Sequence, residues 1–204
     1  MTKLYAGLAA AAIAAVLGWT AYAILAARQT DVFAQCRGGT VGGGEIGGPF
    51  TLVNEEGATV TDSQVFTKPS LVYFGYTFCP DVCPLDNARN AEAVDLLKER
   101  GIDVTPVFIS IDPERDTPEV MRDFTDNLHP AMIGLTGSME QVKAASQAYR
   151  TYFKKQDTGD DYYLVDHSTF TYLVLPGVGF VDFFRRETTP AEMADRVACF
   201  AKAQ

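Results

Sequence analysis

Two cysteines, Cys79 and Cys83, lie four residues apart in the stretch FCPDVCP, and a proline follows each of them. The apolar run LVYFGYTF precedes this stretch and has the composition of a buried strand. Proline is tolerated at the start of a helix and costly inside one, so we expect a helix to begin at Pro84 with Cys83 as its cap. Both sulfurs would then lie near the positive end of the helix dipole, which favours the thiolates that attack disulfides or bind metals.

The residue types leave three roles open for this pair. Cysteines at i and i+4 can come within disulfide range, so redox chemistry is feasible, although thioredoxin-type enzymes separate their cysteines by only two residues. A purely structural disulfide would close too short a loop to stabilise the protein much. A metal site would need further ligands.

The chain has only two histidines to offer as further ligands. We expect His129, just before Pro130, to be an ordinary surface residue. His167 lies in VDHSTFTYLVL at a turn before a buried strand, where a lone histidine is more often structural than a ligand. With two thiolates it would form a soft three-ligand site with an open flank, suited to Cu(I) and tolerable for Cu(II).

Strand and helix patterns alternate in the segments that must position these side chains. Short apolar runs predict strands at 50–54, 58–61, 71–78, 104–111, 131–135, 152–155, 162–165, 169–175 and 180–184. A helix should follow the cysteine pair and end at Gly101, and Thr117, Ser138 and Thr189 are caps that predict three more. The order βαβα, then an antiparallel pair and a helix, predicts an α/β fold whose mixed sheet is covered on both faces.

No charged residue occurs from Leu4 to Ala27, a stretch long enough to cross a hydrocarbon core of roughly 30 Å. The stretch predicts an uncleaved transmembrane helix. A signal peptide is the alternative, because Ala21-Tyr22-Ala23 resembles a cleavage site. Both interpretations place the rest of the chain outside the cytosol, and we expect a single-pass protein of a bacterial inner membrane with its soluble domain in the periplasm.

Seven glycines follow between Arg37 and Gly48, a composition typical of a flexible tether. We therefore expect three parts: a membrane anchor at 1–28, a tether at 29–48 and one globular domain at 49–204. The chain is acidic, with 17 Lys and Arg against 26 Asp and Glu and a net charge of −9. This charge disfavours nucleic acid as a partner.

Three motifs, YFGYTFCPDVCP, FISIDPERDTPEVM and VDHSTFTYLVLP, resemble the SCO/SenC family of copper proteins in their order and separation. The resemblance covers about residues 49–200 and includes the anchor. It implies a thioredoxin-like fold and a copper site made by Cys79, Cys83 and His167. It further implies delivery of copper to the dinuclear copper centre in subunit II of cytochrome c oxidase, with other periplasmic copper carriers as further partners.

The resemblance also leaves a rival function, in which Cys79 and Cys83 form a redox-active disulfide that reduces the cysteines of the same subunit. Copper delivery breaks no bond in a substrate, so we do not expect an enzyme. The other two cysteines, Cys36 and Cys199, would form a structural disulfide, given an even cysteine count in an oxidising compartment. Asp166 is expected to orient His167 through a hydrogen bond to the ring nitrogen that does not face the metal.

Overall fold

The structure is a computed structural model that describes residues 2–30, 32–38, 45–156, 159 and 162–204. Two compact units divide near residue 36. The first contains the N-terminal helix α1 (Thr2–Thr30). The second contains the sheet and the remaining helices. Residues 39–44 of the expected tether lie outside the described residues, so the tether remains a prediction.

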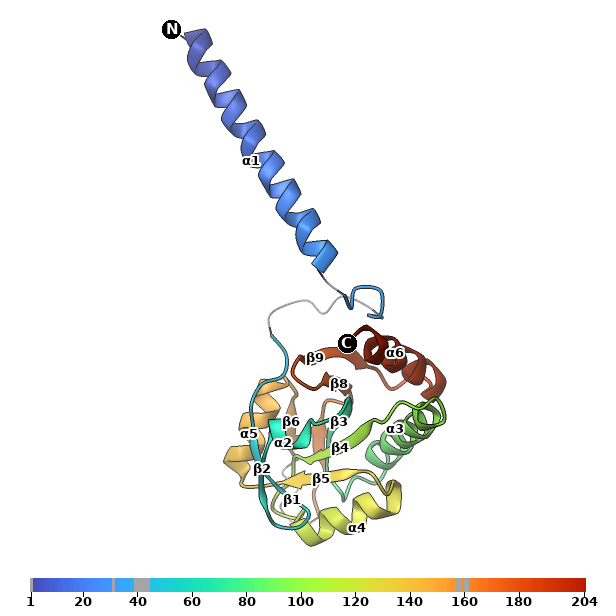
Figure 1. Ribbon diagram of the computed structural model, residues 1–204. Coiled ribbons are helices and arrows are strands. Elements are labelled where there is room, and N and C mark those ends of the chain that lie inside the picture. The colour runs from blue at the N-terminus through green and yellow to red at the C-terminus, as the bar shows by residue number, and fades with distance from the viewer. Residues whose placement is uncertain (1, 31, 39–44, 157–158, 160–161) are drawn as a thin grey trace. The chain divides into compact units, whose positions relative to one another are not determined.

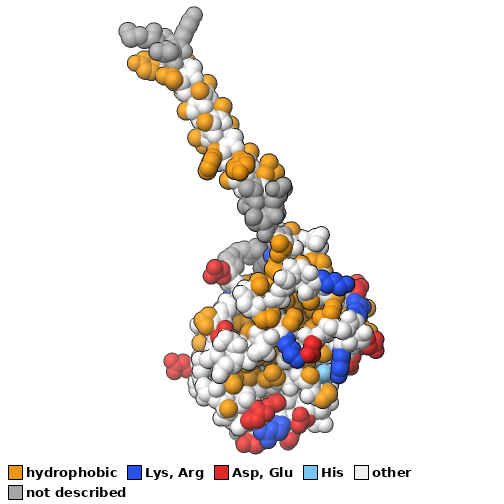
Figure 2. All heavy atoms as spheres, in the orientation of Figure 1, with side chains coloured by type: hydrophobic (Ala, Val, Ile, Leu, Met, Phe, Trp, Pro, Cys, Tyr) orange, Lys and Arg blue, Asp and Glu red, His pale blue; other side chains and the backbone are white. Residues whose placement is uncertain are grey.

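Helix α1 is long and apolar enough to cross a membrane over Tyr5–Leu25, by length and composition. Hydrophobic side chains surround its described part, and Figure 2 shows no acidic or basic side chain along that part. A helix that is apolar on all sides has no single face to bury against a protein core. The same properties would also fit a signal sequence.

A mixed sheet forms the centre of the second unit, with strand order β2-β1-β5-β4-β3-β8-β9 in the described part of the chain. Its strands are β1 (Thr51–Asn54), β2 (Thr59–Thr61), β3 (Ser70–Gly75), β4 (Thr105–Ser110), β5 (Ile133–Thr136), β8 (Thr171–Leu175) and β9 (Gly179–Phe184). Strand β3 pairs in parallel with β4 and antiparallel with β8. Every residue of β3 and of β8 is buried, as expected for strands with both faces covered.

Helices cover both faces of this sheet. Figure 1 shows α3 (Val82–Glu99) and α6 (Pro190–Ala203) on one side and α5 (Met139–Ala148) on the other. Helix α4 (Pro118–Leu128) packs along β5 and also contacts α3. The caps Thr117, Ser138 and Thr189 each accept a hydrogen bond from the first turn of their helix, so the predicted starts of α4, α5 and α6 are confirmed.

Three local predictions differ from the structure. Helix α3 begins at Val82 with Asp81 as its cap, two residues before Pro84, because the first turn has free N–H groups and tolerates a proline at its third position. The short helix α2 (Asp62–Val65) was not predicted. The second hairpin pairs β6 (Phe153–Lys155) with β7 (Val165–His167), so its second strand was predicted about three residues too early.

Candidate metal centre

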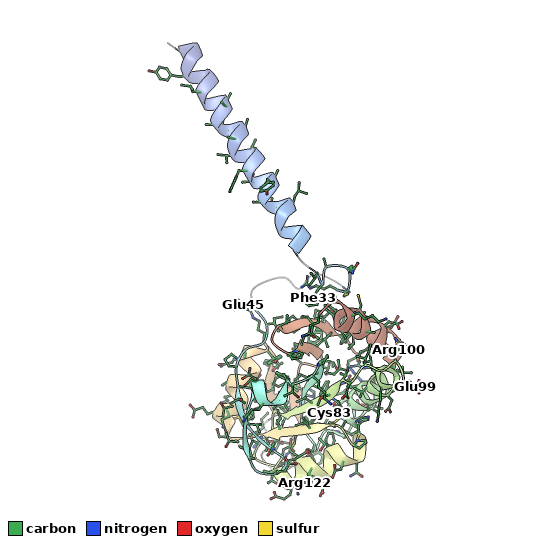
Figure 3. The ribbon with its side chains drawn as sticks, viewed as in Figure 1. Phe33, Glu45, Cys83, Glu99, Arg100 and Arg122 are labelled. Atoms are coloured by element: carbon green, nitrogen blue, oxygen red, sulfur yellow. The ribbon has the colours of Figure 1, made fainter. Side chains whose placement is uncertain are left out.

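Cys79, Cys83 and His167 come together in the folded chain, with their ligand atoms all within 4.8 Å of one another. Cys79 lies in the loop after β3, Cys83 in the first turn of α3 and His167 at the end of β7. Figure 3 labels Cys83 inside the domain, and its side chain is fully buried. Three separate elements therefore converge on one group of two sulfurs and one imidazole.

The backbone around the cysteines lets the two sulfurs lie close to it. The N–H of Cys83 donates a hydrogen bond to the Cys79 sulfur at 3.3 Å, which places that sulfur at the start of α3 as the sequence predicts. Gly75, at the end of β3, leaves the space that Cys83 occupies, since a Cβ there would lie only 2.9 Å from the Cys83 sulfur. A residue without a side chain is therefore needed at this strand end.

The pKa values of the two cysteines are shifted in opposite directions. A hydrogen bond from the Cys83 thiol lowers the pKa of Cys79 to about 3, more than offsetting the opposing effect of burial. Burial raises the pKa of Cys83, and its hydrogen bond to Cys79 raises it further. The pair therefore holds one thiolate, at Cys79, and one thiol, at Cys83.

The imidazole of His167 is held in one tautomer. Its Nδ1 lies 2.8 Å from the carbonyl oxygen of Ser168, and a carbonyl can only accept, so Nδ1 carries the hydrogen. In the neutral ring Nε2 then presents its lone pair, and this atom lies 3.4 Å from the Cys83 sulfur. Asp166 does not take the orienting role predicted for it. Successive residues of a strand point to opposite faces, and the exposed Asp166 accepts a hydrogen bond from Gln156 instead.

Two tyrosines hold the imidazole edge to face, a feature that the sequence reasoning missed. The ring centroid of His167 lies 6.1 Å from that of Tyr73 and 5.8 Å from that of Tyr76. The Tyr73 hydroxyl donates a hydrogen bond to the buried carboxylate of Asp86, which also pairs with Arg186. A tyrosine in a buried strand needs a hydrogen-bond partner, and that requirement was the signal available in LVYFGYTF.

The loop that carries Cys79 is held by Asp116. This carboxylate has no exposed surface and accepts hydrogen bonds from the backbone N–H and the hydroxyl of Thr77 and from the hydroxyl of Ser110. Nearby, Arg115 donates to Asp112 and stacks over Tyr163 at 3.6 Å from the ring centroid. These acidic and basic residues of the motif FISIDPERDTPEVM thus support the loops around the centre.

The remaining candidate residues lie apart from the centre. His129 is buried at the end of α4, where its ring contacts Asp95 and the N–H of Ala131, so it is a structural residue rather than the exposed one predicted. Cys36 and Cys199 are disulfide-bonded, whereas Cys79 and Cys83 are free. This is the connectivity expected from the cysteine count.

One flank of the centre opens toward solvent among aromatic side chains. Cys79 keeps 8% of its surface exposed and His167 is half-buried. Phe78, beside Cys79, packs against Tyr162, and Tyr152 shares two hydrogen bonds with Ser168, the neighbour of His167. We call Phe78, Tyr152 and Tyr162 the site rim; they are 47%, 57% and 58% exposed. Exposed aromatic residues of this kind are enriched at protein interfaces.

Fold and centre together define a thioredoxin-like domain that carries two cysteines and a histidine as a candidate metal centre. The family model described as SCO1/SenC matches residues 39–202. The chain belongs to the SCO1/SenC family.

Individual relatives agree with this assignment. The chain is 59% identical to Protein SenC of Rhodobacter capsulatus, over 96% of this chain and 89% of the relative. It is 42% identical to Arabidopsis thaliana ScoI, whose crystal structure has copper bound, with a TM-score of 0.73 over 77% of this chain and 99% of that one. A structure of BsSco, described as having a disulfide switch and as a member of the Sco family of cytochrome c oxidase assembly proteins, is 27% identical with a TM-score of 0.62, over 78% of this chain and 93% of that one.

Proposed function

We propose that this protein is a copper chaperone that carries one copper ion on Cys79, Cys83 and His167 and delivers it to the dinuclear copper centre of cytochrome c oxidase subunit II. The convergence of these three ligand atoms within 4.8 Å carries the proposal. The copper-bound ScoI structure supports copper as the metal, because that relative shares the fold and 42% of its residues. Thiolate and imidazole ligands also suit copper in both oxidation states.

Transfer would proceed by ligand exchange through the open flank. Cys83 is sealed inside the domain, whereas Cys79 and His167 reach the surface beside the site rim. An acceptor thiolate or imidazole would bind copper from this side as His167 and then Cys79 leave, and the copper would keep its oxidation state. The rim would hold the acceptor in place during the exchange, and periplasmic copper carriers that load the centre would use the same flank.

The proposed location is the periplasmic face of a bacterial inner membrane, with α1 as a single-pass anchor. The length and apolar surface of Tyr5–Leu25 support the anchor. The disulfide at Cys36 and Cys199 supports an oxidising compartment, where such bonds persist. A glycine-rich tether at 29–48 would confine the donor near a membrane-bound acceptor and raise its effective concentration.

A copper titration with single substitutions tests the proposal. A soluble fragment beginning at Gln29 is titrated with Cu(I) against a competing chelator, as the parent and as Cys79→Ala, Cys83→Ala and His167→Ala. Each variant should bind copper more weakly by more than about tenfold, since losing a ligand should exceed the effect of changing its surroundings. His129→Ala is the matched control and should bind like the parent. Unchanged affinity in His167→Ala would show that the three-ligand centre is wrong.

A second candidate function is disulfide reduction by the same cysteines, favoured by the lowered pKa of Cys79. The Cys79 thiolate would attack a disulfide sulfur of the acceptor and release one acceptor thiolate. Cys83, after losing its proton, would then attack the Cys79 sulfur and release the second. Two electrons pass to the acceptor, and a Cys79–Cys83 disulfide forms. The disulfide switch described for BsSco supports this chemistry in the family.

His167 separates the two functions. Copper transfer requires its imidazole, whereas disulfide reduction uses the two sulfurs alone. Reduction of a subunit II disulfide by His167→Ala at the parent's rate, with copper transfer lost, would show that the domain can perform both. Copper transfer at the parent's rate by that variant would show that transfer does not need His167 and would refute the three-ligand centre.

A further inference from the structure

A cavity of about 500 Å³ lies at the end of the sheet opposite the metal centre. One of its walls is Val174 of β8, which pairs with Ser70 at the start of β3, whereas the cysteines follow the other end of β3. The segment that enters the domain, Glu45 to Pro49, forms another wall, fixed by a hydrogen bond from Gly47 to α5. The volume falls within the range of small-molecule sites.

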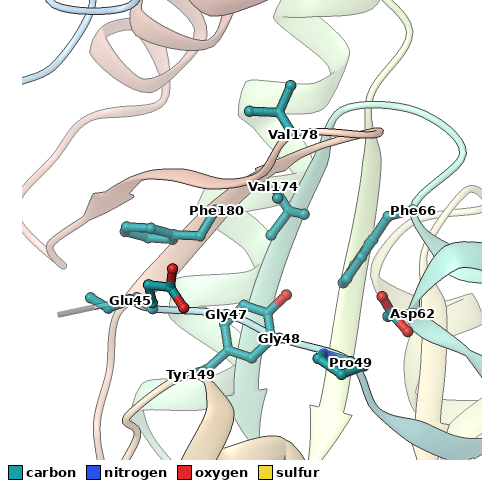
Figure 4. A pocket seen from close by; sticks show the side chains of 12 residues that line it. Glu45, Gly47, Gly48, Pro49, Asp62, Phe66, Tyr149, Val174, Val178 and Phe180 are labelled. Carbon is teal, nitrogen blue, oxygen red and sulfur yellow. The ribbon is translucent and has the colours of Figure 1, made fainter. Parts of the chain in front are cut away.

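The hydroxyl of a buried tyrosine points into this cavity. Tyr149 is only 2% exposed, and its ring is wedged between Phe74 and Tyr172 with centroids 5.4 Å and 5.5 Å away. Figure 4 shows the ring reaching into the cavity between Phe66 and Phe180. Among the described residues the Tyr149 hydroxyl has no hydrogen-bond partner. Burial and the Asp62 carboxylate raise its pKa, so it stays a neutral hydroxyl that can accept a hydrogen bond.

The charged residues that line the cavity are both acidic. Asp62 and Glu45 line it, and no lysine, arginine or histidine is among its lining residues. In the part of the chain that the structure describes, neither carboxylate has an ion-pair partner. Phe66 and Phe180 add two aromatic rings, whose faces attract cations. The carboxylates, the ring faces and the accepting hydroxyl all favour a positively charged ligand.

We propose that this cavity binds an organic ammonium group on a short apolar chain, with the ammonium between Asp62, Glu45 and the Tyr149 hydroxyl and the chain against Phe66 and Phe180. Nothing in copper transfer requires such a site, so the proposal is independent of the metal centre. Because Glu45 to Pro49 forms one wall, a bound ammonium would also tie this entering segment to the domain.

The test uses the full chain in a non-ionic detergent, labelled for NMR, and titrates 2-phenylethylammonium against the neutral 2-phenylethanol. The ammonium should give saturable shifts at Gly47 and Gly179, and the alcohol should bind more weakly by about tenfold, since it lacks the charge-assisted contacts. Asp62→Asn should weaken ammonium binding by about tenfold and Tyr149→Phe by about fivefold. Asp123→Asn, which removes the same charge from the exposed surface of α4, is the control and should change nothing.

Each outcome of these titrations either supports or overturns the proposed ammonium site. Equal binding of the alcohol and the ammonium, or no saturable shifts at concentrations on the order of tens of millimolar, overturns the proposal. A lysine side chain of a partner protein would offer the same ammonium group, so N-acetyl-lysine methylamide is titrated in parallel. Tighter binding of this probe assigns the cavity to a protein lysine, and tighter binding of 2-phenylethylammonium assigns it to a free amine. Copper affinity, measured on the same variants, should stay at the parent's value.

Discussion

Replacing Asp116 with alanine should damage both the stability of the domain and its copper affinity. The carboxylate lies fully buried and accepts three hydrogen bonds, from the Thr77 hydroxyl at 2.6 Å, the Thr77 N–H at 3.2 Å and the Ser110 hydroxyl at 2.5 Å. Each such bond contributes about 1 kcal/mol net, and a donor left without an acceptor costs about as much again or more. Because the two hydroxyls can turn to new acceptors but the N–H cannot, we expect a loss of about 3 kcal/mol in the free energy of unfolding.

The copper effect follows from the position of Thr77, two residues before Cys79. Without Asp116 the loop loses the contacts that fix its path, and copper affinity should fall by about tenfold, the size seen when groups that orient metal ligands are removed. Urea denaturation and a chelator-competed Cu(I) titration measure the two effects on the fragment beginning at Gln29. Asp123→Ala, on the exposed surface of α4, is the control. A destabilised Asp116→Ala that binds copper like the parent would refute the claim that Asp116 positions Cys79.

Three further outcomes are expected. Gly75→Ala should lower stability by about 1–3 kcal/mol and weaken copper binding, because its Cβ would lie 2.9 Å from the Cys83 sulfur; unchanged copper affinity would contradict this. Phe78→Ser should leave copper affinity intact but slow transfer to subunit II in a stopped-flow assay, whereas Val120→Ser, an exposed residue of α4, should not; equal rates would remove the docking role of the rim. Burial raises the pKa of Asp116, so the part of its stabilisation that depends on its protonation is complete below the unfolded pKa of about 4 and is lost as pH rises through the folded value. The stability of the parent relative to Asp116→Asn, measured by urea denaturation, should therefore fall as the pH rises above about 4, and a constant difference would contradict this.

The elements with strong local signals were predictable from the sequence. Thr117, Ser138 and Thr189 fixed three helix starts because a cap and its first turn are read within four residues of chain. The β7 strand was misplaced because its register depends on pairing with β6, which is decided by the tertiary structure and not by local pattern.

The metal ligands were identifiable only in part from the residues themselves. The spacing of Cys79 and Cys83 identified them as candidate ligands. His167 was identified as the third ligand only through the family resemblance, since its partner Cys83 is more than eighty residues away in sequence. The groups that hold His167, namely the Ser168 carbonyl and the two tyrosine rings, were also missed. A backbone carbonyl leaves no trace in residue types, and a strand tyrosine reveals its neighbours only once the sheet is assembled.

The burial of Cys83 affects the two proposed functions in opposite ways. In disulfide reduction Cys83 must become a thiolate inside the domain before it can attack Cys79, and its raised pKa makes that step unfavourable at neutral pH. In copper binding the metal replaces the proton, so the buried sulfur carries its negative charge beside a cation instead of alone. The lone pair of His167, already turned toward Cys83 by the Ser168 carbonyl, adds a ligand that disulfide chemistry does not use. The same desolvation that slows the redox reaction therefore favours the metal, and for this reason we rank copper delivery above thiol reduction.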